Sequence, residues 1–164
     1  MNATKTPTEL TAELAREHFH YDPISGVITR LTGPKPGPCG SNDKGYLRIG
    51  FKGRLYRAHR LAWLLTYGEW PDHQIDHING VKTDNRLLNL RQATLAQNLQ
   101  NRGRHRNNKL GVKGVCQLPN GKFRAQCWRD GRFVLAKRFD TLDEAALAYR
   151  QACLEQFGVF ARPN

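Results

Sequence analysis

Two turn dipeptides in the last third of the chain constrain the fold most strongly. Asn120-Gly121 and Asp130-Gly131 are pairs that favour the tight turns of two-residue β-hairpins. They separate three extended segments, residues 112–118, 122–129 and 132–139. We therefore expect these segments to form a three-stranded antiparallel sheet.

A helix is expected directly after this sheet. Thr141 and Glu144 have the spacing of a capping box, and Gly158 can end the helix. Apolar side chains follow at helical spacing between these limits, namely Leu142, Ala145, Ala146, Tyr149, Ala152, Cys153 and Phe157. One helix packed across one face of the sheet would bury them.

The first hundred residues predict a different arrangement of short elements. A helix is expected to start with Thr6 as cap, Pro7 in the first turn and Glu9 completing a capping box. A turn and a short strand over 27–31 follow, and the Gly- and Pro-rich residues 32–45 indicate a loop. We next expect a hairpin in which residues 46–51 and 54–57 flank Lys52-Gly53. A helix over residues 58–67, ended by Gly68, is expected to follow.

Residues 74–101 predict a strand, a turn at Asn79-Gly80, a second extended segment and a helix. Thr94 and Gln97 form another capping box, so this helix begins there and Asn98 lies in its first turns. Taken together, the elements indicate an α+β fold.

The charge of the chain indicates its class of partner. The 164 residues include 26 Lys and Arg against 14 Asp and Glu, a formal net charge of +12. Such a balance favours nucleic acid or an anionic membrane surface. No apolar run approaches the ~20 residues of a transmembrane helix, and the Thr- and Glu-rich N-terminus does not resemble a secretory signal. We therefore expect nucleic acid and no membrane.

The cysteines give little sign of a structural metal site. None of Cys39, Cys116, Cys127 and Cys153 forms a C-x-x-C pair. A disulfide between Cys116 and Cys127 is conceivable, but we favour reduced thiols in a cytoplasmic protein.

Asp76, His77 and Asn98 carry the chemistry of a metal-assisted phosphodiester hydrolase. Mg²⁺ prefers oxygen ligands, which the Asp76 carboxylate and the Asn98 amide can supply. Neutral His77 can take a proton from the attacking water. Neighbouring side chains of a regular strand point to opposite faces, so the strand must bend or end at His77 for the two to act together.

These residues belong to a longer pattern that resembles the HNH nuclease family, most closely the homing-type endonucleases of phages and introns. The pattern covers roughly residues 20–101 and runs through Tyr56-Arg57-Ala58-His59-Arg60-Leu61-Ala62-Trp63, Asp76-His77-Ile78-Asn79-Gly80, Asp84-Asn85-Arg86, Asn89-Leu90-Arg91 and Gln97-Asn98. The resemblance implies a ββα-metal module. It makes His77 the general base, Asp76 and Asn98 the metal ligands, and Asn89 the residue that holds the loop and orients the base. Asn98 stands where many members have His, which favours Mg²⁺ or Mn²⁺ over Zn²⁺.

Simpler interpretations of the same residues remain open. Asp76 could pair with an arginine, and Asn79 and Asn85 are expected to serve turns. His59 could contact phosphate or form only local hydrogen bonds.

Residues 110–164 resemble the DNA-binding domain of the APETALA2/ethylene-response-factor type, which is also fused to phage HNH nucleases. The matching residues are Gly111-Val112-Lys113-Gly114-Val115, Gly121-Lys122-Phe123-Arg124-Ala125, Arg138-Phe139-Asp140-Thr141, Glu144-Ala145-Ala146, Ala148-Tyr149, Phe157-Gly158, Phe160-Ala161 and Asn164. Cys116 and Leu118 replace arginines of the plant pattern, and Lys137 replaces a glycine. The plant sequence specificity therefore does not carry over.

Strand alternation predicts which face of this sheet meets DNA. Residues 123, 125 and 127 form an apolar face, whereas residues 122, 124, 126 and 128 form a polar one that includes a tryptophan. Trp128 could instead cover the edge of the core. The expected DNA contacts are Lys113, Arg124, Gln126, Trp128 and Arg132 on the sheet, and Arg102, Arg104 and Arg106 in a basic arm.

The sequence thus predicts an HNH domain over residues 1–101, a basic linker over 102–109 and a DNA-binding domain over 110–164. We expect a Mg²⁺- or Mn²⁺-dependent, homing-type endonuclease that acts on double-stranded DNA. We favour a monomer that nicks one strand in the cytoplasm of a bacterial or phage-infected cell. The alternatives are a DNA-binding regulator with a vestigial site and a restriction or defence nuclease.

Overall fold

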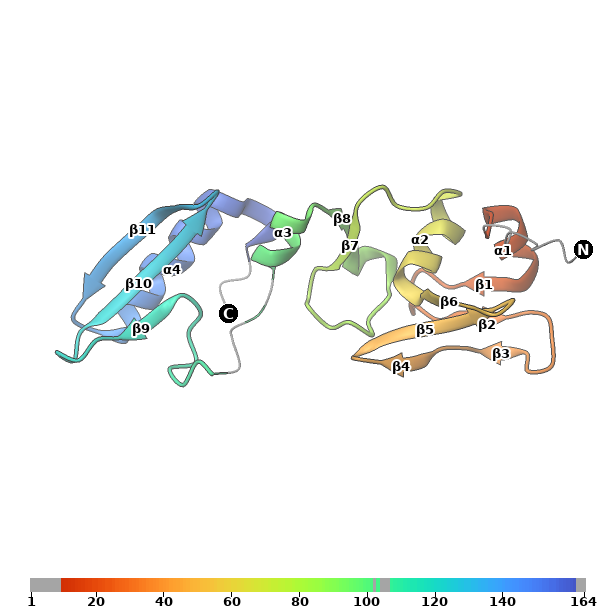
Figure 1. Ribbon diagram of the computed structural model, residues 1–164, viewed down its shortest axis with the longest axis horizontal. Helices are drawn as coiled ribbons and strands as arrows, with labels where there is room; N and C mark the ends of the chain where they lie inside the picture. Colours follow the sequence, from red (N-terminus) through yellow and green to blue (C-terminus); the bar gives the residue numbers. More distant parts are fainter. Residues whose placement is uncertain (1–9, 102, 104–106, 162–164) are drawn as a thin grey trace, which may run out of the picture. The chain divides into compact units, whose positions relative to one another are not determined.

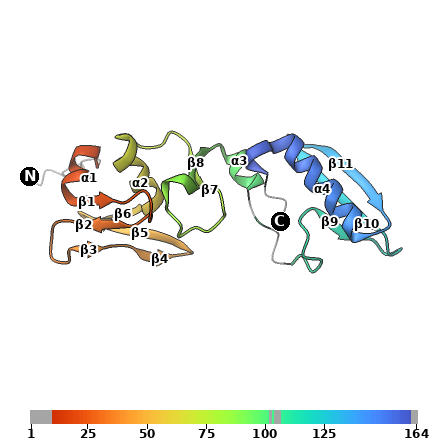
Figure 2. The same cartoon turned by 180° about the vertical axis from the view of Figure 1, so that it is seen from behind.

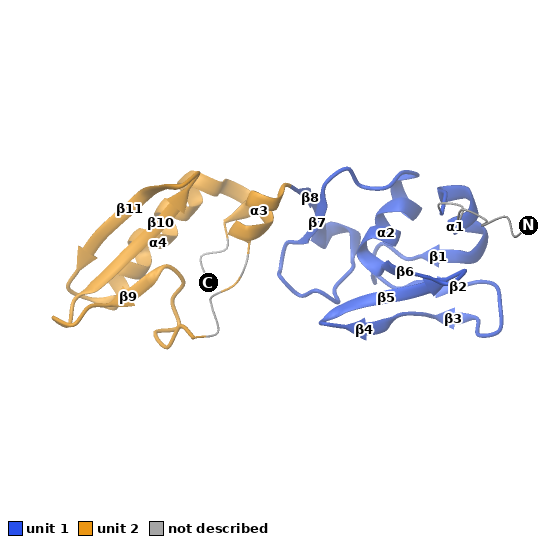
Figure 3. Cartoon of the chain, in the orientation of Figure 1, with its two compact units in different colours: residues 1–93 blue, residues 94–164 orange. Residues whose placement is uncertain are grey.

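The structure is a computed structural model that describes residues 10–101, 103 and 107–161. The chain divides into two compact units, residues 1–93 and 94–164 (Figure 3). Short antiparallel sheets and helices make up both units, which confirms the α+β class. No helix in the described part of the chain is long and apolar enough to cross a membrane.

Three small sheets form the first unit, as Figure 1 shows. The hairpin around Lys52-Gly53 is confirmed. The expectation that 32–45 is a loop throughout is wrong, because two short stretches in it pair with neighbouring strands. The sheets are β1 (Phe19–Tyr21), β2 (Ile28–Arg30) and β3 (Gly37–Pro38); β4 (Ser41–Asp43), β5 (Tyr46–Phe51) and β6 (Arg54–Arg57); and β7 (Gln74–His77) with β8 (Leu90–Ala93).

Two helices lie on one side of strands β1–β6 in both views (Figures 1 and 2). Helix α2 (Ala58–Tyr67) has the expected bounds and ends at Gly68. Helix α1 (Ala12–His18) starts later than expected, because the Thr11 hydroxyl accepts a hydrogen bond from the Leu14 amide, 3.3 Å away, and caps it. The expected cap, Thr6, lies outside the described residues. Side chains from both helices and the sheets share one core, which includes Leu10, Ala15, Phe19, Ile28, Ile49, Leu61, Leu64, Ile75 and Leu90.

The segment after β7 confirms the expected order of elements. A 3₁₀ turn (Leu87–Asn89) leads into β8, and helix α3 (Leu95–Gln100) follows with the predicted capping box of Thr94 and Gln97. Helix α3 falls in the second unit, whereas the sequence placed it in the first domain. The functional boundary at residues 102–109 stays a prediction.

Besides α3, the second unit contains the expected three-stranded sheet with one helix packed on it. Strands β9 (Val115–Gln117), β10 (Phe123–Arg129) and β11 (Arg132–Phe139) form an antiparallel sheet in the order β11-β10-β9. Helix α4 (Leu142–Phe157) covers one face; it lies behind the sheet in Figure 1 and in front of it in Figure 2. The core between them includes Val115, Ala125, Cys127, Ala145, Tyr149 and Cys153.

One close backbone approach joins this helix to the chain before β9. Gly114 has φ +71°, and a Cβ atom there would lie 2.0 Å from Cε2 of Tyr149. Only a residue without a side chain fits this contact. All four cysteines are free, and Cys127 faces Cys153, with 3.8 Å between the sulfur atoms, rather than Cys116.

Candidate active site and nucleic-acid interface

Strand β7 ends at His77, as the chemistry required. Asp76 pairs across the sheet with Arg91, and His77 pairs with Leu90. The side chains of both residues are buried, with Asp76 5% exposed and His77 4% exposed. The end of the strand thus places a carboxylate and an imidazole together in the protein interior.

Asp76 forms an ion pair with Arg91 on the neighbouring strand. Oδ2 of Asp76 accepts hydrogen bonds from Nε and Nη2 of Arg91 at 2.9 and 2.8 Å. The arginine side chain is only 14% exposed. The simpler interpretation, that Asp76 pairs with an arginine, is confirmed, and the pairing fixes the orientation of the carboxylate.

The side-chain amide of Asn85, which is also buried, contacts His77. Nε2 of His77 lies 3.0 Å from Oδ1 of Asn85, which is 2% exposed. Burial lowers the pKa of His77 below its usual value, and the opposing effects of Asn85, Asp76 and Asp84 are smaller. The ring is therefore neutral at neutral pH and able to accept a proton. The expectation that Asn85 serves a turn is wrong, since its side chain contacts His77.

Asn89 organises the loop between the two strands. Its Oδ1 accepts a hydrogen bond from the Asn79 amide at 2.9 Å, and its Nδ2 donates to the Asp84 carbonyl at 2.7 Å. Asn79 serves the turn as expected, because its Oδ1 accepts from the Val81 amide at 2.8 Å. Asn89 thus bonds the loop backbone, and Asn85 contacts the imidazole of His77.

A second histidine lies against His77. His59, in the first turn of α2, is 7% exposed, and its ring centroid is 5.1 Å from that of His77 at an interplanar angle of 81°. Burial lowers the pKa of His59 to about 3, with smaller effects of His77, Arg57 and Arg60. Its Nδ1 is buried and has no hydrogen-bond partner among the described residues. We expected His59 either to contact phosphate or to form local hydrogen bonds. Within the described residues, no local hydrogen bond is seen at Nδ1.

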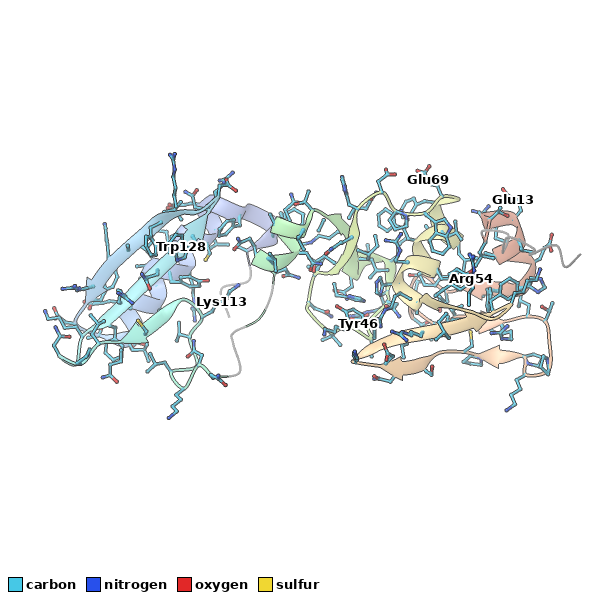
Figure 4. The ribbon with its side chains drawn as sticks, viewed as in Figure 1. Glu13, Tyr46, Arg54, Glu69, Lys113 and Trp128 are labelled. Atoms are coloured by element: carbon cyan, nitrogen blue, oxygen red, sulfur yellow. The ribbon has the colours of Figure 1, made fainter. Side chains whose placement is uncertain are left out.

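An aromatic ring with two cations lies beside these histidines. Tyr46 is labelled in Figure 4, and its ring centroid lies 5.4 Å from that of His59 and 6.1 Å from that of His77. The guanidinium of Arg57 and the ammonium of Lys82 lie 4.8 and 4.6 Å from its centroid. Sequence reasoning missed Tyr46 and Lys82, because only the packing of the 78–86 loop onto β5 brings them together.

Asn98 belongs to the second unit. It lies on α3 and its backbone amide donates to the Thr94 carbonyl at 2.9 Å, within the capped first turn. It stays a predicted metal ligand.

The outer face of the β10–β11 hairpin carries several expected DNA contacts. Trp128 is 51% exposed and stands outside the core of the second unit, with its ring 3.6 Å from that of Phe133 (Figure 4). Arg124 and Gln126 are half-buried. The expectation that Arg132 joins this face is wrong, because Arg132 pairs across the hairpin with Arg129, whose guanidinium bonds the Gln156 carbonyl of α4 on the other side. Nε of Arg124 is buried and has no hydrogen-bond partner in the described part of the chain. The half-exposed Trp128 leaves both interpretations, DNA contact and cover of the core edge, as predictions.

The other expected DNA contacts are Lys113 and the three arginines of the basic arm. Nζ of Lys113 donates to the Gln100 carbonyl at 2.8 Å, so its ammonium group is held against the end of α3. Arg102, Arg104 and Arg106 lie outside the described residues. Their DNA contacts, and that of Lys113, stay predictions.

Comparison with known proteins identifies the segment that holds this site. Residues 56–100 match the family model described as HNH endonuclease. A protein of Acanthamoeba polyphaga mimivirus, named as uncharacterized HNH endonuclease L560, is 34% identical over 110 residues, which cover 66% of this chain. The chain spans 57% of the length of that relative.

Among solved structures, one titled DNA binding and cleavage by the HNH homing endonuclease I-HmuI is 18% identical. The aligned region covers 87% of this chain and 86% of the chain in that structure, with a TM-score of 0.43. This likeness is too distant to support an assignment. Residues 56–100 are thus similar to the HNH endonuclease family, and the viral relative carries the same family name.

Proposed function

We propose that this protein is a metal-dependent DNA endonuclease that hydrolyses a phosphodiester bond. The observation that carries the proposal is a neutral, buried His77 next to a buried Asp76 at a strand end, within a segment that matches HNH endonucleases. The net charge of +12 supports a polyanionic substrate.

His77 has the role of general base in this proposal. A neutral imidazole takes a proton from the water that attacks the phosphorus atom, while Asn89 keeps the loop around it in place. Asp76 and Asn98 would hold a divalent ion. When bound, such an ion stabilises the charge that develops on the phosphate and on the leaving 3′-oxygen.

The donor chemistry of these residues fits Mg²⁺ or Mn²⁺. Zinc sites usually combine three or four nitrogen and sulfur ligands. The described residues contain no group of three or more His, Cys, Asp and Glu that could hold a metal. Mg²⁺ needs less protein, because one or two oxygen ligands suffice and water completes the shell. One buried carboxylate and one amide oxygen match that requirement.

Two surfaces would hold the DNA. In the first unit, the cations of Arg57 and Lys82 beside Tyr46 lie next to His77 and can bind phosphates of the strand that is cut. In the second unit, an APETALA2-like sheet face with Arg124, Gln126 and Trp128 would position the enzyme on duplex DNA. The exposure of this face supports the use, because Trp128 is 51% exposed and Arg124 and Gln126 are only half-buried, so that polar groups can reach phosphates and base edges.

One such site cuts one strand, so we propose a monomer that nicks. A homing-type role follows from the motif pattern described above and is part of the proposal.

Nicking of supercoiled plasmid tests the proposed function. Purified protein is incubated with plasmid and with phage DNA in Mg²⁺, Mn²⁺ or EDTA, alongside His77→Ala and the exposed-histidine control His20→Ala. We expect metal-dependent nicking by wild type and by the control, and a loss of about 10²–10⁴-fold in His77→Ala. Absence of metal-dependent nicking on every DNA would instead favour a DNA-binding regulator. Nicking that survives His77→Ala would remove the general-base role.

A further inference from the structure

The side chain of Asn85 is buried for a reason that packing alone does not supply. It is 2% exposed, and its Nδ2 has no hydrogen-bond partner among the described residues. A buried N–H group without a partner lowers stability, so an apolar side chain of similar size would be less costly there. The contact that only the amide can supply is the one between Oδ1 and Nε2 of His77, at 3.0 Å.

This contact determines which imidazole nitrogen carries the proton. An amide oxygen accepts hydrogen bonds and cannot donate them, so it is compatible only with a protonated Nε2. In a neutral ring, the lone pair then lies on Nδ1, the nitrogen that accepts a proton. The opposite tautomer would place two lone pairs against each other at 3.0 Å.

The N-terminal hairpin holds Asn85 in this position. The Tyr21 hydroxyl, on β1, donates to the Asn85 carbonyl at 2.7 Å, and the Leu87 amide donates to the Pro23 carbonyl at 2.9 Å. The turn at Gly26 also packs closely against the backbone of Asn85 and Arg86. A Cβ atom at Gly26 would lie 2.6 Å from the carbonyl carbon of Asn85, and φ there is +75°.

We infer that Asn85 is a positioning residue that keeps His77 in the Nε2-protonated tautomer, and that the β1–β2 hairpin is the platform that fixes Asn85. The inference rests on the proposed function only in that His77 acts as a base. It gives a part of residues 1–55 that the motifs left unexplained a defined task at the site.

The tautomer of His77 can be read directly from the ¹⁵N shifts of its two ring nitrogens. Histidine-labelled wild-type protein is compared at neutral pH with Asn85→Leu, which has a similar volume and no acceptor, and with Asn85→Asp, which keeps an acceptor. His77→Ala identifies the signals. We expect a protonated Nε2 in wild type and in Asn85→Asp, and a mixture of both tautomers in Asn85→Leu. Tyr21→Phe should shift the balance partly, and Tyr56→Phe, whose ring stacks on Trp70, should not.

Kinetics separate this role from a general loss of structure. Asn85→Leu should lower kcat for nicking by about 10–100-fold with little change in KM, because DNA binding does not use this amide. A wild-type ring protonated on Nδ1, which needs no variant to detect, would overturn the inference. So would an unchanged tautomer in Asn85→Leu. If wild type fails to nick while the tautomer still depends on Asn85, the proposed function is wrong and the positioning contact stands.

Discussion

The polar residues at the end of β7 and those on the outer face of β10 differ in burial and in pairing. Asp76 and His77 are about 5% exposed or less, and Arg91 and Asn85 fix their orientation. On β10, Trp128 is half-exposed, and a buried nitrogen of Arg124 has no hydrogen-bond partner among the residues that the structure describes. The first set is organised before any ligand arrives, whereas the second set leaves contacts for a ligand to complete. The difference is the one expected between groups that react and groups that bind.

The largest expected effect contrasts two ion pairs, one in each unit. Arg91→Met should lower the free energy of unfolding of the first unit by about 3 kcal/mol in metal-free buffer, because it leaves the Asp76 charge buried. Lys122→Met breaks the exposed pair with Asp140, whose side chains are 51% and 77% exposed, and should cost less than about 1 kcal/mol. Urea unfolding measures both. Equal costs would show that burial does not separate the two regions.

The pH dependence of stability should come from the first unit. The pKa of His59 falls from 6.5 in the unfolded chain to about 3 in the fold, and that of His77 falls as well. Their contribution is complete above about pH 6.5 and decreases as the pH falls towards 3, because only the unfolded chain then binds the protons. The slope is up to about 1.4 kcal/mol per pH unit for each histidine.

Replacing one of these histidines tests this dependence. His59→Phe should lower the slope of unfolding free energy against pH by the equivalent of about one proton, measured by urea unfolding across this pH range. His20→Phe, at an exposed position, serves as the control. A slope that is unchanged in His59→Phe would mean that His59 is not buried neutral.

Charges on the outer sheet face should act on DNA binding and hardly on stability. Arg124→Gln and Arg138→Gln, which are cross-strand partners on the same face, should each reduce the slope of log affinity against log salt by roughly one unit if each arginine contacts one phosphate. Arg150→Gln removes the same charge from an exposed position of helix α4, which covers the other face. Titration of labelled duplex DNA at several salt concentrations measures the slopes. Identical slopes for all three variants would place the DNA elsewhere.

The smallest effect is expected at Trp128. Because this side chain is 51% exposed and outside the core, Trp128→Ala should cost no more than about 1.5 kcal/mol of unfolding free energy. A core tryptophan would cost about 3–5 kcal/mol. A loss in that higher range would show that Trp128 supports the fold instead of the binding face.

Most elements could be predicted because their signals are local. The hairpin at Lys52-Gly53, helix α2 with Gly68 and the capping boxes at Thr94 and Thr141 each depend on residues a few positions apart. The start of α1 was misplaced because both Thr6 and Thr11 have the chemistry of a cap. Strands β3 and β4 were missed because pairs of two or three residues leave no periodic pattern.

The candidate site residues could be named from the sequence, whereas their contacts could not. The order of the motif pointed to Asp76 and His77 without any structure. The contacts of Asn85 were missed because a local rule for asparagine favours turns, while these contacts come from His77 and from Tyr21, 64 residues away in sequence. The cations around Tyr46 were missed for the same reason, since no local pattern brings Lys82 to β5.

The approach of Gly114 to Tyr149 has a consequence for handedness. Two separate constraints act at this position: a positive φ that disfavours L-residues, and an aromatic ring in the place of an L-Cβ. Tyr149→Ala would make room for a methyl group but would leave the backbone constraint. In a chemically synthesised C-terminal unit, D-alanine at position 114 would accept the positive φ and direct its methyl group away from the place that the ring occupies. The mirror-image residue should therefore be tolerated where its natural counterpart is not.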